Sequence, residues 1–261
     1  MSKRKKLMPV HRSVVSFTMT TDLRILHDLA HVPKGSNCAL IIRHGDRDAM
    51  LNKVVTYHKI VLKLNLRSFE RDSRVGLNQQ GVERSLELGR SLKGFSELRS
   101  WSSPIGRCVD TCKRVSEGFG TSNGVESTHF LGMQPPFMVQ PAKAYELMVD
   151  LGLDGFVEAY INDRIDPSIA LPCPEGTRML FSYAIERIGG MKGGIGLFVT
   201  HDMILTPALA YYYGYDFKGK GLVQFLDGFV LYETEEGFTA RFCGQEMKVS
   251  KNGRPLGSRR P

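Results

Sequence analysis

Residues 37–47 constrain the fold of this chain more than any other stretch. The apolar run Ala39–Ile42 leads directly into Arg43, His44 and Arg47. A short apolar run with β-branched residues predicts a buried strand of a parallel sheet. Ligands bind at the carboxyl ends of strands in open α/β sheets, and Arg offers fixed bidentate donors. The cations therefore indicate a site for an anion such as phosphate, although a strand that ends in a solvated polar turn would look similar locally.

Two later segments repeat the pattern. Leu98–Trp101 predicts a short strand, and the turn after it brings Arg107 into the first turn of a helix. Leu197–Thr200 predicts a second buried strand that ends at His201, with Asp202 at the start of the next helix. Backbone amides and the helix dipole at such starts favour an anion.

The sequence also predicts three further helices. Leu77–Leu92 is a helix that Asn78 can cap, with Val82, Leu86, Gly89 and Leu92 on its apolar face. Another helix begins at Pro174. A short helix is predicted over Thr21–His31 because apolar residues recur there at helical spacing.

Three edge strands are predicted near the end of the chain. They are Leu222–Leu226, Phe229–Thr234 and Gly237–Cys243, with a hairpin turn at 235–236 between the last two.

The expected domain organisation is simple. Residues 1–36 form an N-terminal extension, and residues 37–247 form one α/β domain. Insertions near 48–76 and 120–172 lie over the edge formed by the carboxyl ends of the strands. Residues 248–261 form a basic tail that we expect to be disordered.

The formal net charge of +8 suggests nucleic acid until the charges are located. Many of the cations lie at the two ends of the chain, and the part between them is close to neutral. This pattern is typical of solvated ends, so specific nucleic-acid binding is not expected. The terminal cations are Lys3, Arg4, Lys5, Lys6, Lys248, Lys251, Arg254, Arg259 and Arg260.

Composition indicates a cytoplasmic protein. The 42% hydrophobic content of a chain of 261 residues suffices for one large core, and no stretch approaches the length of a membrane span. The basic start is not followed by the apolar core of a signal peptide. Five cysteines is an odd and sparse count, consistent with reduced thiols.

No metal or cofactor is expected. His27 and His31 lie one helical turn apart, as in zinc-binding helices, but no third ligand is evident. We expect them to be surface histidines. Cys108 and Cys112 have the same spacing and also lack further ligands nearby.

Three segments together resemble the signature elements of the histidine phosphatase superfamily, which includes phosphoglycerate mutase-like enzymes and histidine acid phosphatases. They are Arg43–Arg47, Ser103–Arg107 and Thr200–Asp202. The helix entry Leu77–Gly81 is also similar to that of the family, and the resemblance covers roughly residues 37–247.

The resemblance implies a mostly parallel sheet with helices on both faces. His44 would be the nucleophile that forms a phosphohistidine. Arg43, Arg107 and His201 would hold the phosphoryl oxygens, and Arg47 matches a third arginine typical of the acid phosphatase branch.

The general acid is left open by the resemblance. Asp202 matches the acid of the acid phosphatase branch, whereas Glu146 lies where the mutase-like branch places its acid. Glu146 follows a possible strand at Tyr145–Val149. Ala49 departs from the acid phosphatase pattern, which has proline at that place.

The predicted function is hydrolysis of phosphomonoesters through phosphohistidine. Two alternatives remain: a mutase-like phosphotransferase, and a non-catalytic module that binds phosphate or nucleic acid. The substrate would be a phosphorylated small molecule or a phosphoprotein. The sequence indicates neither which one nor the oligomeric state.

Overall fold

The computed structural model describes residues 23–48, 74–132 and 136–257. Most of the first predicted insertion therefore lies outside the described residues, as do residues 1–22 and 258–261.

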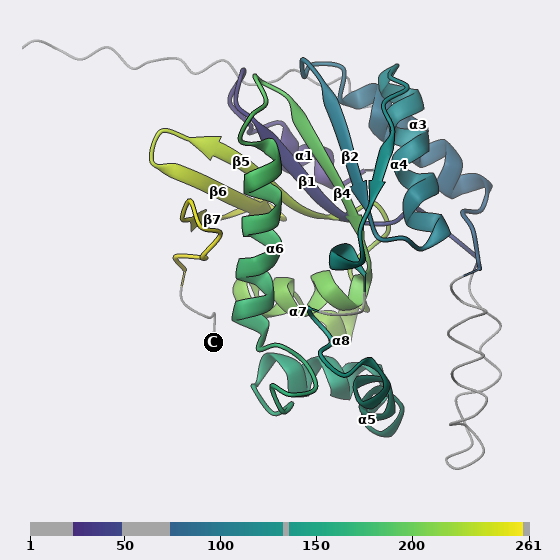
Figure 1. Ribbon diagram of the computed structural model, residues 1–261, viewed down its shortest axis with the longest axis vertical. Helices are drawn as coiled ribbons and strands as arrows, with labels where there is room; N and C mark the ends of the chain where they lie inside the picture. The colour runs from purple at the N-terminus through teal and green to yellow at the C-terminus, as the bar shows by residue number, and fades with distance from the viewer. Residues whose placement is uncertain (1–22, 49–73, 133–135, 258–261) are drawn as a thin grey trace, which may run out of the picture.

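A single seven-stranded mixed sheet forms the centre of the molecule (Figure 1). Its strands are β1 (Cys38–Arg43), β2 (Leu98–Ser102), β3 (Val125–Ser127), β4 (Ile195–Thr200), β5 (Gly228–Thr234), β6 (Gly237–Phe242) and β7 (Gln245–Val249). The spatial order is β3-β2-β4-β1-β5-β6-β7. Strands β3, β2, β4 and β1 are parallel, whereas β5, β6 and β7 each run antiparallel to the preceding strand in that order. The predicted α/β class is confirmed, with the parallel arrangement confined to one half of the sheet.

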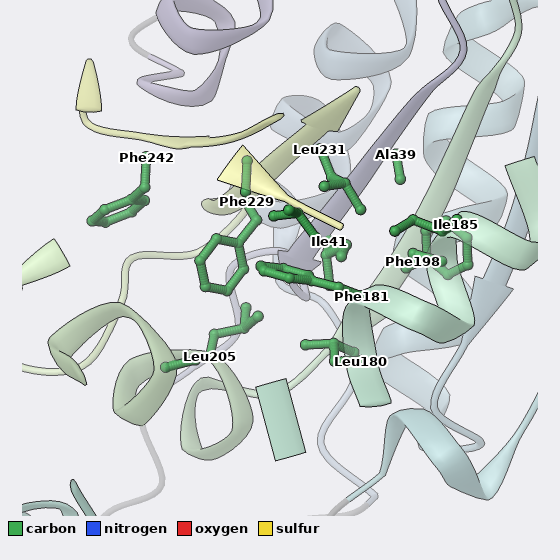
Figure 2. Packing of buried hydrophobic residues seen from close by; sticks show 14 of the residues in the cluster. Ala39, Ile41, Leu180, Phe181, Ile185, Phe198, Leu205, Phe229, Leu231 and Phe242 are labelled. Carbon is green, nitrogen blue, oxygen red and sulfur yellow. The ribbon is translucent and has the colours of Figure 1, made fainter. Parts of the chain in front are cut away.

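Helices cover both faces of the sheet. They are α1 (Ile25–Leu29), α3 (Gln79–Ser91), α4 (Gly106–Phe119), α5 (Pro141–Ile161), α6 (Cys173–Ile188), α7 (Asp202–Tyr213) and α8 (Phe217–Lys220), with a 3-10 turn at His129–Leu131. Side chains alternate along β1, so Ile41 faces α6 and α7 while Leu40 and Ile42 face α1, α3 and α4. In Figure 2, Phe181 of α6 and Leu205 of α7 lie against the strands.

The segment assigned to an N-terminal extension packs into the domain from Leu23 onward. Leu26 and Leu29 of α1 are fully buried in the core on one face of the sheet. Arg24 forms ion pairs with Asp28 and Asp227, and it thereby ties α1 to the start of β5. The described part of residues 1–36 is therefore structurally continuous with the sheet.

The first of the three predicted edge strands is wrong. Leu222–Leu226 lies in a loop before β5. The apolar side chains that suggested a strand are buried from a loop instead: Val223 packs in one core cluster and Leu226 in the other. β5 and β6 lie inside the sheet, and β7 is at its edge.

Residues 248–257 also differ from the prediction, which made them part of a disordered tail. β7 extends to Val249, and the chain then folds back so that Val249 bridges Pro255. Gly253 is buried, and its Cα lies close to α6 near Ser182. Figure 1 shows this last segment beside α6.

The second predicted insertion contains ordered helices. The expected strand at Tyr145–Val149 is wrong, because these residues belong to α5. A kink at Gly152, with φ of 69°, divides that helix. Phe156 and Tyr160 after the kink pack in a separate apolar cluster with Met203 of α7.

Helix α3 confirms the predicted cap and part of the predicted face. Oδ1 of Asn78 accepts a hydrogen bond from the Gly81 amide over 2.8 Å. Gly89 and Leu92 are buried as predicted, whereas Val82 and Leu86 are only half-buried. The buried residues of the helix also include Leu88 and two small residues, Gly81 and Ser85. Small side chains are needed there because α3 and α4 approach closely.

Within the described ranges, no helix is both long and apolar enough to cross a bilayer. His27 and His31 are exposed, as predicted. No grouping of three or more potential metal ligands occurs among the described residues.

Candidate active site

The carboxyl ends of β1, β4 and β2 meet at one edge of the sheet. Arg43 pairs in register with Thr200, and Ser102 pairs with Val199. The residues that follow, His44, His201 and Ser103, therefore come together although they are far apart in the sequence.

His44 is almost completely buried, with 1% of its surface exposed. Its Nδ1 lies 2.9 Å from the Gly45 carbonyl oxygen. Its Nε2 receives a hydrogen bond from Nε of Arg107 over 2.9 Å. A carbonyl only accepts and a guanidinium only donates, so Nδ1 carries the proton and Nε2 presents its lone pair.

The environment keeps His44 neutral. Burial is the main cause that lowers its pKa, to about 2; the hydrogen bond to Gly45 raises it, and the electrostatic effects of Arg107, His201 and Arg43 lower it further. A neutral imidazole with an unprotonated Nε2 is the form of histidine that can act as a nucleophile.

Arg107 is placed by helix α4, as the sequence predicted. It is the second residue of that helix and is buried. Oγ1 of Thr111, one turn later, donates to the Arg107 carbonyl over 2.7 Å and accepts from the Gly45 amide over 2.9 Å. Strand β1 and helix α4 are thus joined at the base of the site.

Arg43 is held on three sides. Its NH1 donates to the Val223 carbonyl over 2.7 Å, and its guanidinium carbon lies 3.9 Å from the centroid of the Phe225 ring. Its NH2 forms an ion pair of 2.7 Å with Asp202. Burial lowers the pKa of Arg43, as do the charges of Arg47 and Arg107, while Asp202 opposes them.

Asp202 lies at the first position of α7, where its Oδ1 accepts a hydrogen bond from the Met203 amide over 2.8 Å. The other carboxylate oxygen faces Arg43. This carboxylate is partly exposed, with 17% of its side chain accessible. The structure therefore brings Asp202 to the guanidinium that adjoins the predicted nucleophile.

His201 completes the cluster. Its Nε2 lies 2.9 Å from Oγ of Ser103, and its ring centroid is 5.7 Å from that of His44. The thiol of Cys108 lies 3.8 Å from the same nitrogen. Burial raises the pKa of Cys108 to about 12, so the thiol stays neutral.

Two predicted residues are less closely integrated. Arg47 is half-buried beyond His44, and its NH1 lies 3.4 Å from the Asp48 carbonyl. Glu146 is exposed on α5, and within the described residues no hydrogen bond or ion pair joins it to the site. The structure thus gathers Arg43, His44, Arg107, His201 and Asp202, but not Glu146.

Sequence reasoning did not assign a role to Ser103, Thr111 or Phe225. Ser103 could have been found, because it follows β2 directly as His44 follows the end of β1. Phe225 gives no such signal, because its loop resembles a strand. Its ring centroid lies 5.5 Å from that of His44, so it forms a wall of the site.

Family comparison agrees with this geometry. Residues 39–128 match the model described as histidine phosphatase superfamily (branch 1), which confirms the predicted family. The matched range contains Arg43, His44 and Arg107. His201 and Asp202 lie beyond it, and their membership of the site comes from the structure. A search of curated proteins finds no match to this chain.

Several solved structures are similar at low identity. YhfR of Bacillus stearothermophilus is 14% identical, with a TM-score of 0.46 over 85% of this chain and 96% of that chain. A phosphoglycerate mutase from Bacillus anthracis is 18% identical, with a TM-score of 0.40 over 84% and 94%. A phosphoserine phosphatase from Entamoeba histolytica is 14% identical, with a TM-score of 0.43 over 85% and 94%. At these identities the similarities do not identify a substrate for this chain.

Proposed function

Since residues 39–128 match the model of the histidine phosphatase superfamily, we propose that this chain hydrolyses phosphomonoesters through a phosphohistidine on His44. The observation that carries the proposal is the placement of that imidazole. It is buried, its Nδ1 donates to a carbonyl, and its Nε2 accepts from a guanidinium. Burial also lowers its pKa, which favours the neutral form. Covalent capture by such a nitrogen divides hydrolysis into two easier displacements.

The surrounding cations are proposed to hold the phosphoryl group. Phosphoryl transfer spreads negative charge over three equatorial oxygens, and catalysis consists mainly of positioning and charge neutralisation. Arg43, Arg107 and His201 supply this charge around His44, with Arg47 as a further contributor. No metal or cofactor is required by this arrangement.

The contacts within the site indicate what a substrate must replace. Arg107 donates to the same Nε2 that attacks, and Arg43 is paired with Asp202. A phosphate can accept both guanidiniums, because its oxygens form charge-assisted bonds with arginine. Binding would then free the lone pair of His44 and release Asp202 from its partner.

Asp202 is proposed as the principal general acid, and Glu146 as a residue outside the reaction. Once a bound phosphate pairs with Arg43 in place of Asp202, the negative charge of the phosphate favours protonation of Asp202. The acid would protonate the leaving oxygen and then, as a carboxylate, take a proton from the attacking water.

A direct experiment is to trap the intermediate. Wild type is mixed with ³²P-labelled phosphomonoester and quenched without acid, and the adduct is then tested for acid lability. We expect a labile adduct in wild type and none in His44→Ala. An equal adduct in the variant would overturn the assignment of the nucleophile.

The rival functions give different results in the same assay. A mutase-like phosphotransferase would form the adduct but return the phosphoryl group to a bound acceptor, with little inorganic phosphate released. A non-catalytic module would form no adduct. Release of inorganic phosphate in buffer containing EDTA would support hydrolysis without a metal.

The substrate class is proposed only as a phosphorylated small molecule or phosphoprotein. A cytoplasmic location is likewise a proposal, supported by the free thiols of the cysteines. A panel of phosphorylated metabolites and phosphopeptides would narrow the substrate most directly.

A further inference from the structure

A closed ring of hydrogen bonds lies beneath the proposed nucleophile. Nε of Arg107 donates to Nε2 of His44 over 2.9 Å, and Nδ1 of His44 donates to the Gly45 carbonyl over 2.9 Å. The Gly45 amide donates to Oγ1 of Thr111 over 2.9 Å, and this hydroxyl donates to the Arg107 carbonyl over 2.7 Å. We propose that Thr111 is a positioning residue, which fixes the reactive tautomer of His44 and its alignment with Arg107.

Each bond of the ring has only one possible direction. The guanidinium and the amide can only donate, and the two carbonyls can only accept. The Thr111 hydroxyl must therefore accept from Gly45 and give its single proton to Arg107. A hydroxyl supplies both roles at once, whereas alanine or valine at this position supplies neither.

Burial makes the ring depend on this one hydroxyl. Thr111 has no exposed surface and His44 has 1%. Gly45 is buried as well, so water has no access that would replace the lost partner of its amide. We expect the Gly45 backbone to shift to find a new partner, and the carbonyl that selects the Nδ1–H tautomer to move with it.

The ring also explains why a helix and a strand must be joined here. Thr111 lies one turn after Arg107 on α4, while His44 and Gly45 follow β1. Through the Thr111 hydroxyl, one bond aligns the first turn of α4 with the end of the strand. A misplacement of about 1 Å between reacting groups can cost about 100-fold in rate.

The test compares Thr111→Val with Thr111→Ser and with a matched control. Thr177 on α6 is also buried and also donates to the carbonyl four residues earlier, over 2.8 Å, but it is not part of the ring. Thr177→Val therefore reports the general cost of removing a buried helical hydroxyl. If Thr111→Val does not fold, Thr111→Ala takes its place.

Two measurements are made on each full-length variant. The first is the tautomer of His44, read from the ¹⁵N shifts of its ring against a His44→Asn reference. The second is kcat for a phosphomonoester. We expect removal of the Thr111 hydroxyl to introduce the Nε2–H tautomer and to lower kcat by about 10- to 100-fold. Thr111→Ser should stay within about threefold of wild type, because its hydroxyl restores the ring.

The inference would be overturned by an unchanged tautomer in the Thr111 variant that lacks the hydroxyl, or by a loss of kcat no larger than that of Thr177→Val. The kinetic arm rests on the proposed function, but the spectroscopic arm does not. If wild type forms no phosphohistidine, the proposed function fails while the tautomer measurement still decides the role of Thr111.

Discussion

At the scale of single residues, the site depends on a histidine whose burial disfavours protonation. Burial together with three neighbouring cationic or imidazole groups lowers the pKa of His44 to about 2. An exposed histidine has a pKa near 6.5. The same environment that keeps Nε2 available for attack therefore makes the folded protein less stable in acid than it would be without this side chain.

The lowered pKa of His44 predicts a measurable pH dependence of the free energy of unfolding. Below about pH 6.5 the unfolded state binds a proton at His44 that the folded state does not bind. The free energy of unfolding therefore falls as pH falls toward 2. The slope from one such group is about 1.4 kcal/mol per pH unit. Urea unfolding at pH 6.5 and 4.5 should show wild type losing about 2 kcal/mol more than His44→Asn over that interval. Parallel losses in the two proteins would contradict the neutral, buried state of His44.

A second prediction at this scale concerns the general acid. Asp202→Asn should lose about 10²- to 10⁴-fold in rate on an alkyl phosphate, because the leaving oxygen then receives no proton. The loss should be much smaller on p-nitrophenyl phosphate, whose leaving group is already a weak base. The matched variant Glu146→Gln removes an exposed carboxylate and should behave like wild type on both substrates. The reverse pattern would assign the acid to Glu146, as in the mutase-like interpretation.

At the scale of elements, the sequence was most informative where polar residues follow apolar strands. β1 and β4 were predicted from their apolar runs, and the parallel register then brings His44 and His201 together. Local pattern could not reveal the half of the sheet that is antiparallel, since pairing depends on distant residues. It also misassigned the loop containing Phe225, where apolar residues are buried without forming a strand.

Helix packing supplies a prediction about small residues. α3 and α4 approach so closely that a Cβ on Gly89 would lie 2.0 Å from the Val115 carbonyl oxygen, and one on Gly118 would lie 2.0 Å from that of Leu86. Both neighbours are backbone atoms and cannot rotate away. Gly89→Ala should therefore lower the free energy of unfolding by at least about 2 kcal/mol.

The control for this prediction lies on the same helix pair. A Cβ on Gly106, at the start of α4, would meet no atom within 4 Å. Gly106→Ala should change stability by less than about 1 kcal/mol, since only the flexibility of the unfolded chain differs. Urea denaturation measures the free energy of unfolding of both variants. Equal losses would show that the close contact between α3 and α4 does not make Gly89 harder to replace than Gly106.

At the scale of the whole molecule, the boundaries of the domain lie further out than charge suggested. The basic end was predicted to be a disordered tail because of its lysines and arginines. Charge, however, does not report backbone pairing: the Leu256 amide donates to the Lys248 carbonyl over 2.8 Å. The Ser250 amide likewise donates to the Arg254 carbonyl over 2.9 Å. Through these bonds residues 254–256 lie beside the end of β7, and Gly253 lies against α6.

Truncation tests whether this packed segment contributes to stability. Gly253 has φ of 79°, and a Cβ there would lie 2.3 Å from the Ser182 amide nitrogen. Removing residues 250–261 should lower Tm by several degrees, because about 1 kcal/mol shifts Tm by about 2–4 °C in a domain of this size. Gly253→Val should have a similar effect through strain and collision. Both proteins should keep the turnover of a small phosphomonoester within about threefold at a temperature where they are folded, because neither change touches the proposed catalytic groups. A loss beyond about tenfold, or ~1.4 kcal/mol of transition-state stabilisation, would show that the C-terminal segment reaches the site.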